Sequence, residues 1–410
     1  MKFATKTALI VAVLASLVSF AKFDHCRNSG WGVPGQYVHA CYSDLPALFS
    51  ARGLTTHTWP YASATNSVEY PPGTAMVMWG TSYLVAHNAN EYRNYFDVNA
   101  LLIALLFIGS IILLRKMNPD LWYLGAVAPA VVASLYINWD LWAVLPAIAA
   151  IYYFDRERYE IGALLLGVAT ATKFFPIVLL LPIALILLRR HQFNNLLKYL
   201  GIAIGSTVLI NAPFAITDRT GWWRFFKLNS DRGPDWGSLW HALSVFGYNV
   251  PHLNLDSILL FLIGATGYVL YFLKQERVPS LASSAFFIVA IFVTASKVYS
   301  PQYILWLTPL AVLALRDRKD RAAFWIWQGA ELLYHMAIWE YFAGFEGAKF
   351  GLPAHWYAVA ALVRIAALGY FCWWISRPHS GSDEREIGSS TAGESPQNPD
   401  FSPRRVGGYA

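Results

Sequence analysis

The chain has 410 residues, of which 56% are hydrophobic, 16% are aromatic and only 14% are charged. A soluble domain carries about 25% charged residues, so the composition excludes an ordinary soluble enzyme or binding module. The net charge of +6 could suggest nucleic-acid binding, but Lys and Arg cluster in short loops between apolar segments. That clustering is the positive-inside pattern of membrane proteins, and the sequence therefore predicts an integral membrane protein.

The chain opens with a candidate membrane helix. Residues 1–20 place Lys2 and Lys6 before an apolar run, and a cleaved signal peptide has a similar pattern. We favour an uncleaved first helix, because no small-x-small cleavage site is convincing and the rest of the chain is embedded in the membrane either way.

Further apolar segments recur along the chain, and most must be helices because lipid offers backbone groups no partners. They lie near 7–21, 71–87, 98–114, 120–136, 139–154, 160–172, 174–188, 198–216, 256–273, 281–296, 301–315, 322–341 and 355–375. Residues 376–410 are instead rich in Ser, Gly, Pro and charge, which predicts a disordered cytoplasmic tail. The sequence thus predicts an all-α, polytopic protein whose body, residues 1–375, has about 12 transmembrane helices.

Short basic loops between the apolar segments set the expected orientation. They are Arg115–Lys116, Arg156–Arg158, Arg189–Arg190, Lys274–Arg277 and Arg316–Arg321. We place them in the cytoplasm together with the N-terminus, so the long loops 22–70 and 217–255 face outside. Two full crossings between residues 71 and 114 would conflict with this orientation, and we therefore expect one stretch, 71–87, not to span fully.

Two apolar stretches are too short for the two crossings that their flanking loops require. Residues 160–188 must go out and return, although one crossing takes about 20 residues, and residues 281–315 repeat this arrangement. The tips of the two stretches, 170–176 and 296–303, should therefore lie below the outer surface. Non-helical backbone at that depth in a membrane is tolerated only where it is buried in protein or lines a water-filled cavity.

Each tip carries one lysine followed by a proline: Lys173 with Pro176, and Lys297 with Pro301. Proline suits the first turn of the returning helix, and a lysine beside a helix N-terminus makes an anion site. An intramembrane lysine is a functional candidate by default, while the alternative is that both side chains snorkel to the outer headgroups. The expected anion is a lipid phosphate, since the cavity opens to the outer leaflet.

The loop 22–70 supplies two carboxylates that could act as a base. Asp44 precedes a short amphipathic stretch, where either it or Ser43 would also serve as a helix cap. Opposite two phosphate-binding lysines, Asp44 becomes the natural general base. Glu69 is the rival carboxylate, and its position just before Tyr70 and two prolines places it at the lip of a membrane segment.

The three cysteines have different expected roles. Cys26 and Cys41 both lie in the outer loop, where an oxidising compartment favours a disulfide; two free thiols packed as small apolar groups are the alternative. Cys372 in the last helix is expected to be an inert core residue. The sequence has no Asp-x-Asp pair and no His/Cys cluster with metal-ligand spacing, so we expect neither a metal nor another cofactor.

The arrangement resembles the GT-C superfamily of polyprenyl-phosphate-sugar-dependent glycosyltransferases. It is most similar to glycosyltransferase family 87, the polyprenol-phosphate-mannose-dependent α-mannosyltransferases of actinobacterial envelopes. The segments that carry the resemblance are Tyr42–Pro46, Glu69–Pro72, Ala171–Pro176, Trp222–Gly233 and Lys297–Tyr303. They extend over roughly residues 40–305, and their order and topology carry more weight than any single motif.

The resemblance implies a single displacement with inversion at the sugar. Asp44 would take the proton of an acceptor hydroxyl, and lysines and Arg232 would neutralise a polyprenyl-phosphate leaving group. A late histidine assists in some relatives, and His335 is the counterpart here. The residues expected to bind substrate are Tyr42, Arg52, Glu69, Tyr70, Lys173, Arg232, Lys297, Tyr299, Gln302 and His335.

The expected partners are the lipid bilayer, a polyprenyl-phosphate sugar donor and an envelope glycolipid or glycan acceptor, without nucleic acid. Mannose rests on the family alone, and arabinofuranose is an alternative. A transporter or flippase of lipid-linked sugars is the main rival function. It would share the helices and the lysines, but it needs no carboxylate fixed beside them, and no strong two-fold repeat of the transporter kind is visible. A non-catalytic scaffold would leave the buried lysines unexplained.

Overall fold

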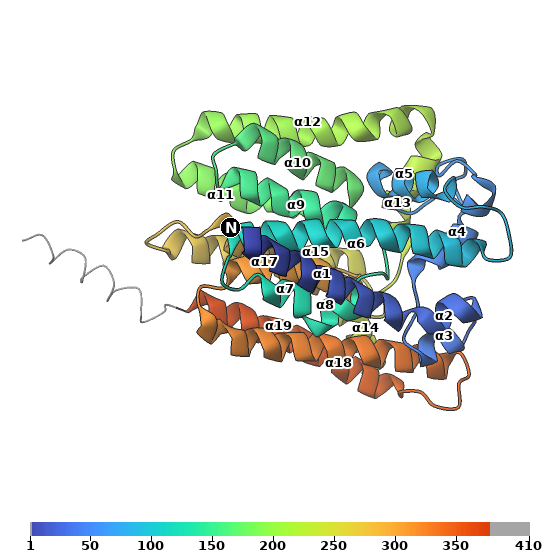
Figure 1. Cartoon of the computed structure of the whole chain (residues 1–410). Coiled ribbons are helices and arrows are strands. Elements are labelled where there is room, and N and C mark those ends of the chain that lie inside the picture. The colour runs from blue at the N-terminus through green and yellow to red at the C-terminus, as the bar shows by residue number, and fades with distance from the viewer. Residues whose placement is uncertain (1, 378–410) are drawn as a thin grey trace, which may run out of the picture. The chain divides into compact units, whose positions relative to one another are not determined.

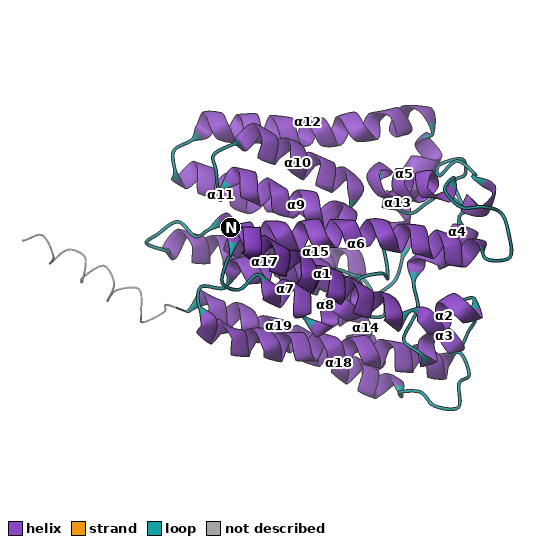
Figure 2. Cartoon of the chain, viewed as in Figure 1, coloured by secondary structure: helices purple, strands orange, loops and turns teal. Residues whose placement is uncertain are grey.

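The computed structural model describes residues 2–377, and over these residues it consists of helices and loops, with no β-strand (Figures 1 and 2). The α-helices are α1 (Lys2–Lys22), α2 (Asp24–Ser29), α3 (Gly35–Val38), α4 (Asp44–Ala51), α5 (Pro72–Ser82), α6 (Glu91–Met117), α7 (Tyr123–Val127), α8 (Pro129–Ser134), α9 (Leu141–Phe154), α10 (Tyr159–Thr172), α11 (Leu180–Arg189), α12 (Phe193–Thr217), α13 (Arg219–Asp231), α14 (Leu239–Val245), α15 (Leu253–Lys274), α16 (Leu281–Ala295), α17 (Ile304–Ala314), α18 (Arg321–Phe345) and α19 (Ala354–Ser376). Short 3₁₀ helices are η1 (Leu54–Thr56), η2 (Phe175–Leu179), η3 (Pro301–Tyr303) and η4 (Arg318–Asp320).

Apolar helices dominate the part of the chain that the structure describes. Five of them are long and apolar enough to cross a membrane: α1, α6, α12, α15 and α19. The shorter apolar helices of 10–17 residues are Leu141–Phe154, Tyr159–Thr172, Phe175–Arg189, Leu281–Ala295 and Pro301–Ala314. The predicted all-α membrane fold is confirmed at this level. One compact unit ends at Ile375, and the predicted tail lies outside the described residues from residue 378 onward.

Two predicted apolar segments form shorter helices than their length suggested. Segment 120–136 is divided into α7 and α8, because Ala128 precedes a proline and adopts an extended ψ of 119° instead of a helical one. Segment 71–87 forms only α5, which has 11 residues and a rise of about 17 Å. That is roughly half of a bilayer core of about 30 Å, in agreement with the expectation that this stretch does not span fully.

The two predicted tips are breaks between short helices, as expected. Helix α10 ends at Thr172 and η2 begins at Phe175 with Pro176 in its first turn. Helix α16 ends at Ala295, and η3 begins with Pro301. Lys173 follows α10 directly in an extended conformation, with φ −137° and ψ 137°, so its side chain leaves the helix at the break.

Contacts between loops fall into two groups, one among the loops predicted to face outside and one among the basic loops. The two loops predicted to face outside meet where the Trp59 indole N–H donates to Asp218 at 3.0 Å. Two of the basic loops meet where Arg189 donates to the carbonyl of Glu276 at 3.1 Å. A third basic loop reaches the N-terminal helix, where Arg115 donates to the Thr5 hydroxyl at 2.9 Å. The short helices α2, α3, α4 and α13 gather at one end of the long helices (Figure 1), which is the end that carries the candidate site.

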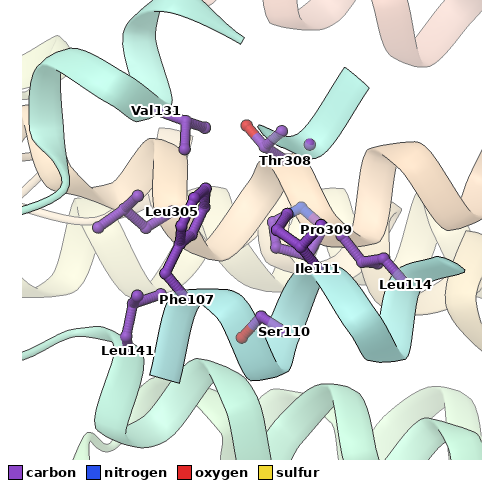
Figure 3. Close-up of a pocket in the computed structure, with 10 residues that line it drawn as sticks. Phe107, Ser110, Ile111, Leu114, Val131, Leu141, Leu305, Thr308 and Pro309 are labelled. Atoms are coloured by element: carbon purple, nitrogen blue, oxygen red, sulfur yellow. The ribbon is translucent and has the colours of Figure 1, made fainter. Parts of the chain in front are cut away.

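The interior between α6, α8, α9 and α17 is closely packed. A gap of about 10 Å³ is lined by Phe107, Ser110, Ile111, Leu114, Gly125, Val131, Leu141, Leu305, Thr308 and Pro309 (Figure 3). A cavity needs about 10–15 Å³ to hold one water molecule, and this lining is almost entirely apolar. The gap is therefore a packing defect in the core and not a ligand site.

Candidate functional site

The first turn of α4 presents Asp44 to the interior. Ser43 is the cap of this helix, since its hydroxyl oxygen accepts from the Leu45 N–H at 3.2 Å. The Asp44 N–H donates to the carbonyl of Ile137 at 2.7 Å, which fastens the turn to the segment after α8. Because Ser43 supplies the cap, the Asp44 carboxylate is available for other partners.

A disulfide closes the loop that leads to α4. Cys26 and Cys41 are joined, with their Cα atoms 5.9 Å apart, which confirms the predicted pairing. Both residues are fully buried. The bridge ties α2 to the segment immediately before Tyr42 and Asp44.

One amide connects the predicted base to the predicted anion-binding lysine. The Asn138 Nδ2 group donates to Asp44 Oδ2 at 2.6 Å and to the Tyr70 hydroxyl at 2.7 Å. Its Oδ1 accepts from the Lys173 ammonium at 3.0 Å, while the Tyr42 hydroxyl donates to Asp44 Oδ1 at 2.7 Å. Four of the five side chains in this network were predicted site residues, and they come from three separate segments of the chain.

Lys173 is also paired with a buried carboxylate. Its ammonium lies 3.2 Å from Asp140 Oδ1 and 4.6 Å from the centre of the Tyr70 ring. The Trp306 indole N–H donates to the same Asp140 oxygen at 2.6 Å, and Asp140 is fully buried. The lysine is only 7% exposed, which argues against snorkelling to the headgroups.

The environment of Asp44 raises the pKa of its carboxyl group to about 6. Burial is the main cause, because removal from water penalises the charged form. Hydrogen bonds from Tyr42 and Asn138 and the charge of Lys173 act in the opposite direction. A carboxylate with this pKa is ionised at neutral pH and can still accept a proton, which suits a general base.

An aromatic cavity adjoins this network. It has a volume of about 180 Å³ and is lined by Tyr70, Pro71, Thr170, Phe174, Thr207, Val208, Asn211, Trp222, Phe225 and Phe226. The lining comes from the two residues before α5, the end of α10 and the break after it, and helices α12 and α13. Tyr70 lines the cavity and also accepts a hydrogen bond from Asn138. One end of the cavity therefore lies next to the polar network.

The second predicted lysine lies in a separate cluster. The Lys297 ammonium donates to the carbonyls of Ser230 at 3.1 Å and Arg232 at 2.9 Å. The Asp235 N–H donates to the Lys297 carbonyl at 2.8 Å, and Arg232 forms an ion pair with Asp235 at 2.8 Å. Lys297 thus joins the tip after α16 to the segment after α13, and the Arg232 side chain is 33% exposed.

Tyr303 is within electrostatic reach of both clusters. Four charged side chains interact electrostatically with its phenol: Asp44, Asp140, Asp235 and Arg232. Its ring stacks on Trp306 with centroids 3.6 Å apart, which holds it in place. Charges of both clusters therefore act on the same tyrosine.

The remaining predicted site residues have other neighbours. Arg52 and Glu69 form a two-pronged ion pair, with Nη2 2.8 Å from Oε1. The Tyr299 hydroxyl donates to Glu331 at 2.9 Å in a buried network with Arg364. The first contact holds the loop before α5, and the second ties the tip after α16 to α18 and α19.

His335 and Gln302 are both buried. His335 Nε2 lies 3.1 Å from the ammonium of Lys22 and accepts from the Trp339 indole at 3.1 Å. The Trp339 ring in turn packs on Tyr42 with centroids 5.3 Å apart. His335 is therefore linked to the Asp44 network indirectly, through Trp339 and Tyr42.

Asn138 of this network and Asp140, the ion-pair partner of Lys173, were not among the predicted site residues. They lie at the junction between the apolar segments 120–136 and 139–154. The sequence did offer a signal for Asp140, because it is an ionisable residue within a long apolar stretch. Such a residue is a functional candidate by default in a membrane protein. No protein-family model and no curated protein sequence matches this chain, so the resemblance to glycosyltransferase family 87 stays a prediction.

Proposed function

We propose that this protein is a membrane glycosyltransferase of the GT-C type, similar to family 87. It transfers a hexose, mannose by that analogy, from a polyprenyl-phosphate sugar to a hydroxyl of an envelope glycolipid or glycan. The proposal includes about 12 crossings of the cell membrane and an active site on the outer side. One observation carries it: a single amide, Asn138, links the carboxylate of Asp44 to the ammonium of Lys173, beside an aromatic cavity.

In the proposed reaction Asp44 accepts the proton of the acceptor hydroxyl while that oxygen attacks the anomeric carbon. The bond between the anomeric carbon and the phosphate oxygen breaks, and the polyprenyl phosphate leaves with the electron pair. Attack opposite the leaving group inverts the anomeric configuration. A positioned base of this kind contributes typically about 10²–10⁴-fold to the rate.

The charges favour one place for the phosphate. Asp44, Asp140 and Lys173 together carry one net negative charge, which would repel a phosphate. Arg232, Asp235 and Lys297 carry one net positive charge, and Arg232 is partly exposed. We therefore assign the phosphate to the side of Arg232 and Lys297, so that positive charge meets the leaving group where its negative charge develops.

The aromatic cavity suits the first isoprenoid units of the donor. Phe225 and Phe226 line the cavity from α13, and Arg232 follows the end of that helix. Six helical residues correspond to roughly 9 Å, which a lipid tail in the cavity and its phosphate at Arg232 could bridge. Apolar lining with a few polar groups at one end is typical of such ligand sites.

The test is a transfer assay in which the purified protein receives radiolabelled polyprenyl-phosphate mannose, glucose or arabinofuranose together with a membrane glycolipid extract. We expect the label of one donor to enter the acceptor fraction, and none to enter it with Asp44→Asn. Proteoliposomes that move the labelled lipid between leaflets without transferring any sugar would instead favour the flippase.

A further inference from the structure

Two histidines meet at the outer end of the protein, away from the network of Asp44. His57 follows η1 in the loop that leads to α5, and His87 lies in the loop between α5 and α6. Their Nε2 atoms are 3.3 Å apart. The proposed transfer reaction uses neither residue, so their contact needs its own explanation.

The hydrogen bonds of His57 determine which of its ring nitrogens carries a proton. His57 Nδ1 lies 3.0 Å from the Ser82 hydroxyl oxygen. That hydroxyl donates its only hydrogen to the carbonyl of Trp79 at 2.6 Å, so it can only accept from His57. The proton of a neutral His57 ring is therefore on Nδ1, and the Nε2 lone pair points toward His87.

The same reasoning applies to His87. Its Nδ1 lies 3.4 Å from Glu91 Oε2, and an ionised carboxylate only accepts hydrogen bonds. Nδ1 therefore donates to Glu91, and a neutral His87 ring also turns its Nε2 lone pair toward His57. Two lone pairs at this separation repel each other unless a cation lies between them.

A transition-metal ion fits this position. Zinc binds histidine nitrogen at about 2.0–2.1 Å in tetrahedral geometry, which places two such ligands about 3.3–3.4 Å apart. A second-shell acceptor on the other ring nitrogen is a regular feature of metal-bound histidine, and Ser82 and Glu91 occupy those positions. Imidazole suits zinc, copper and nickel.

We propose that His57 and His87 form a surface site for a divalent transition metal, with both Nε2 atoms as ligands and water completing the coordination. Among residues 2–377 no group of three or more His, Cys, Asp or Glu side chains is arranged to hold a metal, so this site has only two protein ligands. The His87 side chain is 58% exposed, which leaves room for the waters.

His57 is held rigidly in the orientation that the site needs. Its carbonyl accepts from the Trp79 indole at 3.0 Å, and its ring stacks on Tyr83 with centroids 4.2 Å apart. Its φ of 54° lies in the left-handed region, where a residue other than glycine persists only if its surroundings impose it. A metal bound by His57 and His87 would join the loop 52–70, which carries Tyr70, to the loop between α5 and α6.

The test uses the full chain without a histidine tag, in detergent, with Zn²⁺ or Cu²⁺ alone as the probe. We expect calorimetry to give one Zn²⁺ per chain, and the Cu²⁺ spectrum in electron paramagnetic resonance to show two equatorial nitrogens. Binding should weaken at least tenfold in His57→Asn, which tolerates the left-handed backbone, and in His87→Gln. Glu91→Gln should weaken it about 10–100-fold through the lost second-shell acceptor.

A second pair of neighbouring histidines serves as the matched control. His25 and His39 are both exposed, but their rings stack face to face with centroids 3.5 Å apart, so His39→Gln should leave binding unchanged. The proposal fails if the wild type binds no more Zn²⁺ than the His57→Asn, His87→Gln double variant, which would indicate a shared proton instead. Because metal binding is the readout, the result is independent of whether the protein transfers sugars.

Discussion

The two oxygens of Asp44 have different neighbours, and this asymmetry bears on how the residue could act. Oδ1 accepts from Tyr42, while Oδ2 accepts from Asn138, which also holds Tyr70 and Lys173. The carboxylate is thus oriented on both sides without a direct ion pair. Glu69, the rival base, gives both of its oxygens to Arg52.

The first prediction concerns the choice between these carboxylates. Asp44→Asn keeps the shape and one accepting oxygen for Asn138, while its amide nitrogen can donate to the Tyr42 hydroxyl. It cannot accept a proton, so turnover should fall by about 10²-fold or more while donor binding stays near that of the wild type. Glu69→Gln should cost less, because it disturbs only an ion pair that positions the loop. Single-turnover rates and donor binding measure both effects. If Glu69→Gln abolishes turnover and Asp44→Asn does not, the assignment of the base is wrong.

The second prediction is a pH profile. The active form of a base is deprotonated, so kcat/KM should fall tenfold per pH unit below the Asp44 pKa of about 6 and level off above it. Asn138→Ala removes a hydrogen bond that stabilises the charged form of Asp44. The pKa of Asp44 should therefore rise, and the acidic fall of kcat/KM should move to higher pH. If the acidic fall of kcat/KM stays at the same pH in Asn138→Ala, a group other than Asp44 controls the profile.

The third prediction concerns the buried pair of Lys173 and Asp140. Lys173→Met leaves the fully buried Asp140 carboxylate without its counter-charge, which should lower the free energy of unfolding by about 3–5 kcal/mol. Adding Asp140→Asn removes the unpaired charge and should restore most of the loss. Thermal unfolding in detergent measures both changes. An unchanged midpoint in Lys173→Met would mean that the pair does not contribute to stability.

Residue chemistry allowed part of this network to be predicted, and packing explains the rest. Asp44, Tyr70 and Lys173 stand out in the sequence because polar side chains are costly near a membrane. Asn138 is uncharged and lies between two apolar segments, so its role emerges only when three distant segments converge on it. The fully buried Arg364 carried the signal of a charge inside the last apolar segment, but only the structure shows what it contacts, the rings of Tyr299 and Tyr334.

At the scale of elements, the contact between α5 and α10 sets the position of Lys173. A Cβ atom on Gly73 would lie 2.7 Å from the Cα of Thr172, and the Thr74 hydroxyl donates to the Thr172 carbonyl at 2.7 Å. Helix α5 therefore approaches the last turn of α10 backbone to backbone, and Lys173 is the next residue along the chain.

The fourth prediction follows from that contact. Gly73→Ala should push α5 away from α10, lower the free energy of unfolding by about 1–3 kcal/mol, and weaken activity by displacing Lys173. Gly80→Ala in the same helix is the matched control, since nothing lies within 4 Å of its added Cβ, and alanine is the better helix former. Equal effects of the two variants on thermal unfolding would contradict a close approach at Gly73.

Element boundaries show where sequence patterns predict well. Both tips were located from segment length, because residues 160–188 and 281–315 are each too short for two full crossings. The structure ends α10 at Thr172 and α16 at Ala295, just before these tips. The division of 120–136 was missed because its composition is uniformly apolar and only Pro129 marks the break. Hydropathy predicts which segments of the chain are buried. Where a helix ends depends instead on backbone sterics, such as the effect of a proline on the residue before it.

At the scale of the whole molecule, contacts between loops bear on orientation. Two of the basic loops, 189–190 and 274–277, contact each other, and the loops 22–70 and 217–255 contact each other. Sequence charge alone predicted this grouping through the positive-inside pattern. The packing of the helices shows which loops share an end, while only the charges indicate which end faces the cytoplasm.

The last prediction tests that orientation with two single-cysteine variants at exposed sites. Asn249→Cys lies in the loop between α14 and α15, and Asn194→Cys lies in the first turn of α12. A membrane-impermeant thiol reagent added to intact cells should label position 249, because that loop belongs to the end with Asp44, and should reach position 194 only after permeabilisation. The native disulfide leaves Cys372 as the one other thiol, and Cys372→Ser removes that background. Labelling of position 194 and not of position 249 would invert the orientation and place Asp44 on the cytoplasmic side. A donor presented in the outer leaflet could then not reach the base, and the proposed reaction would need a lipid-linked sugar facing the cytoplasm.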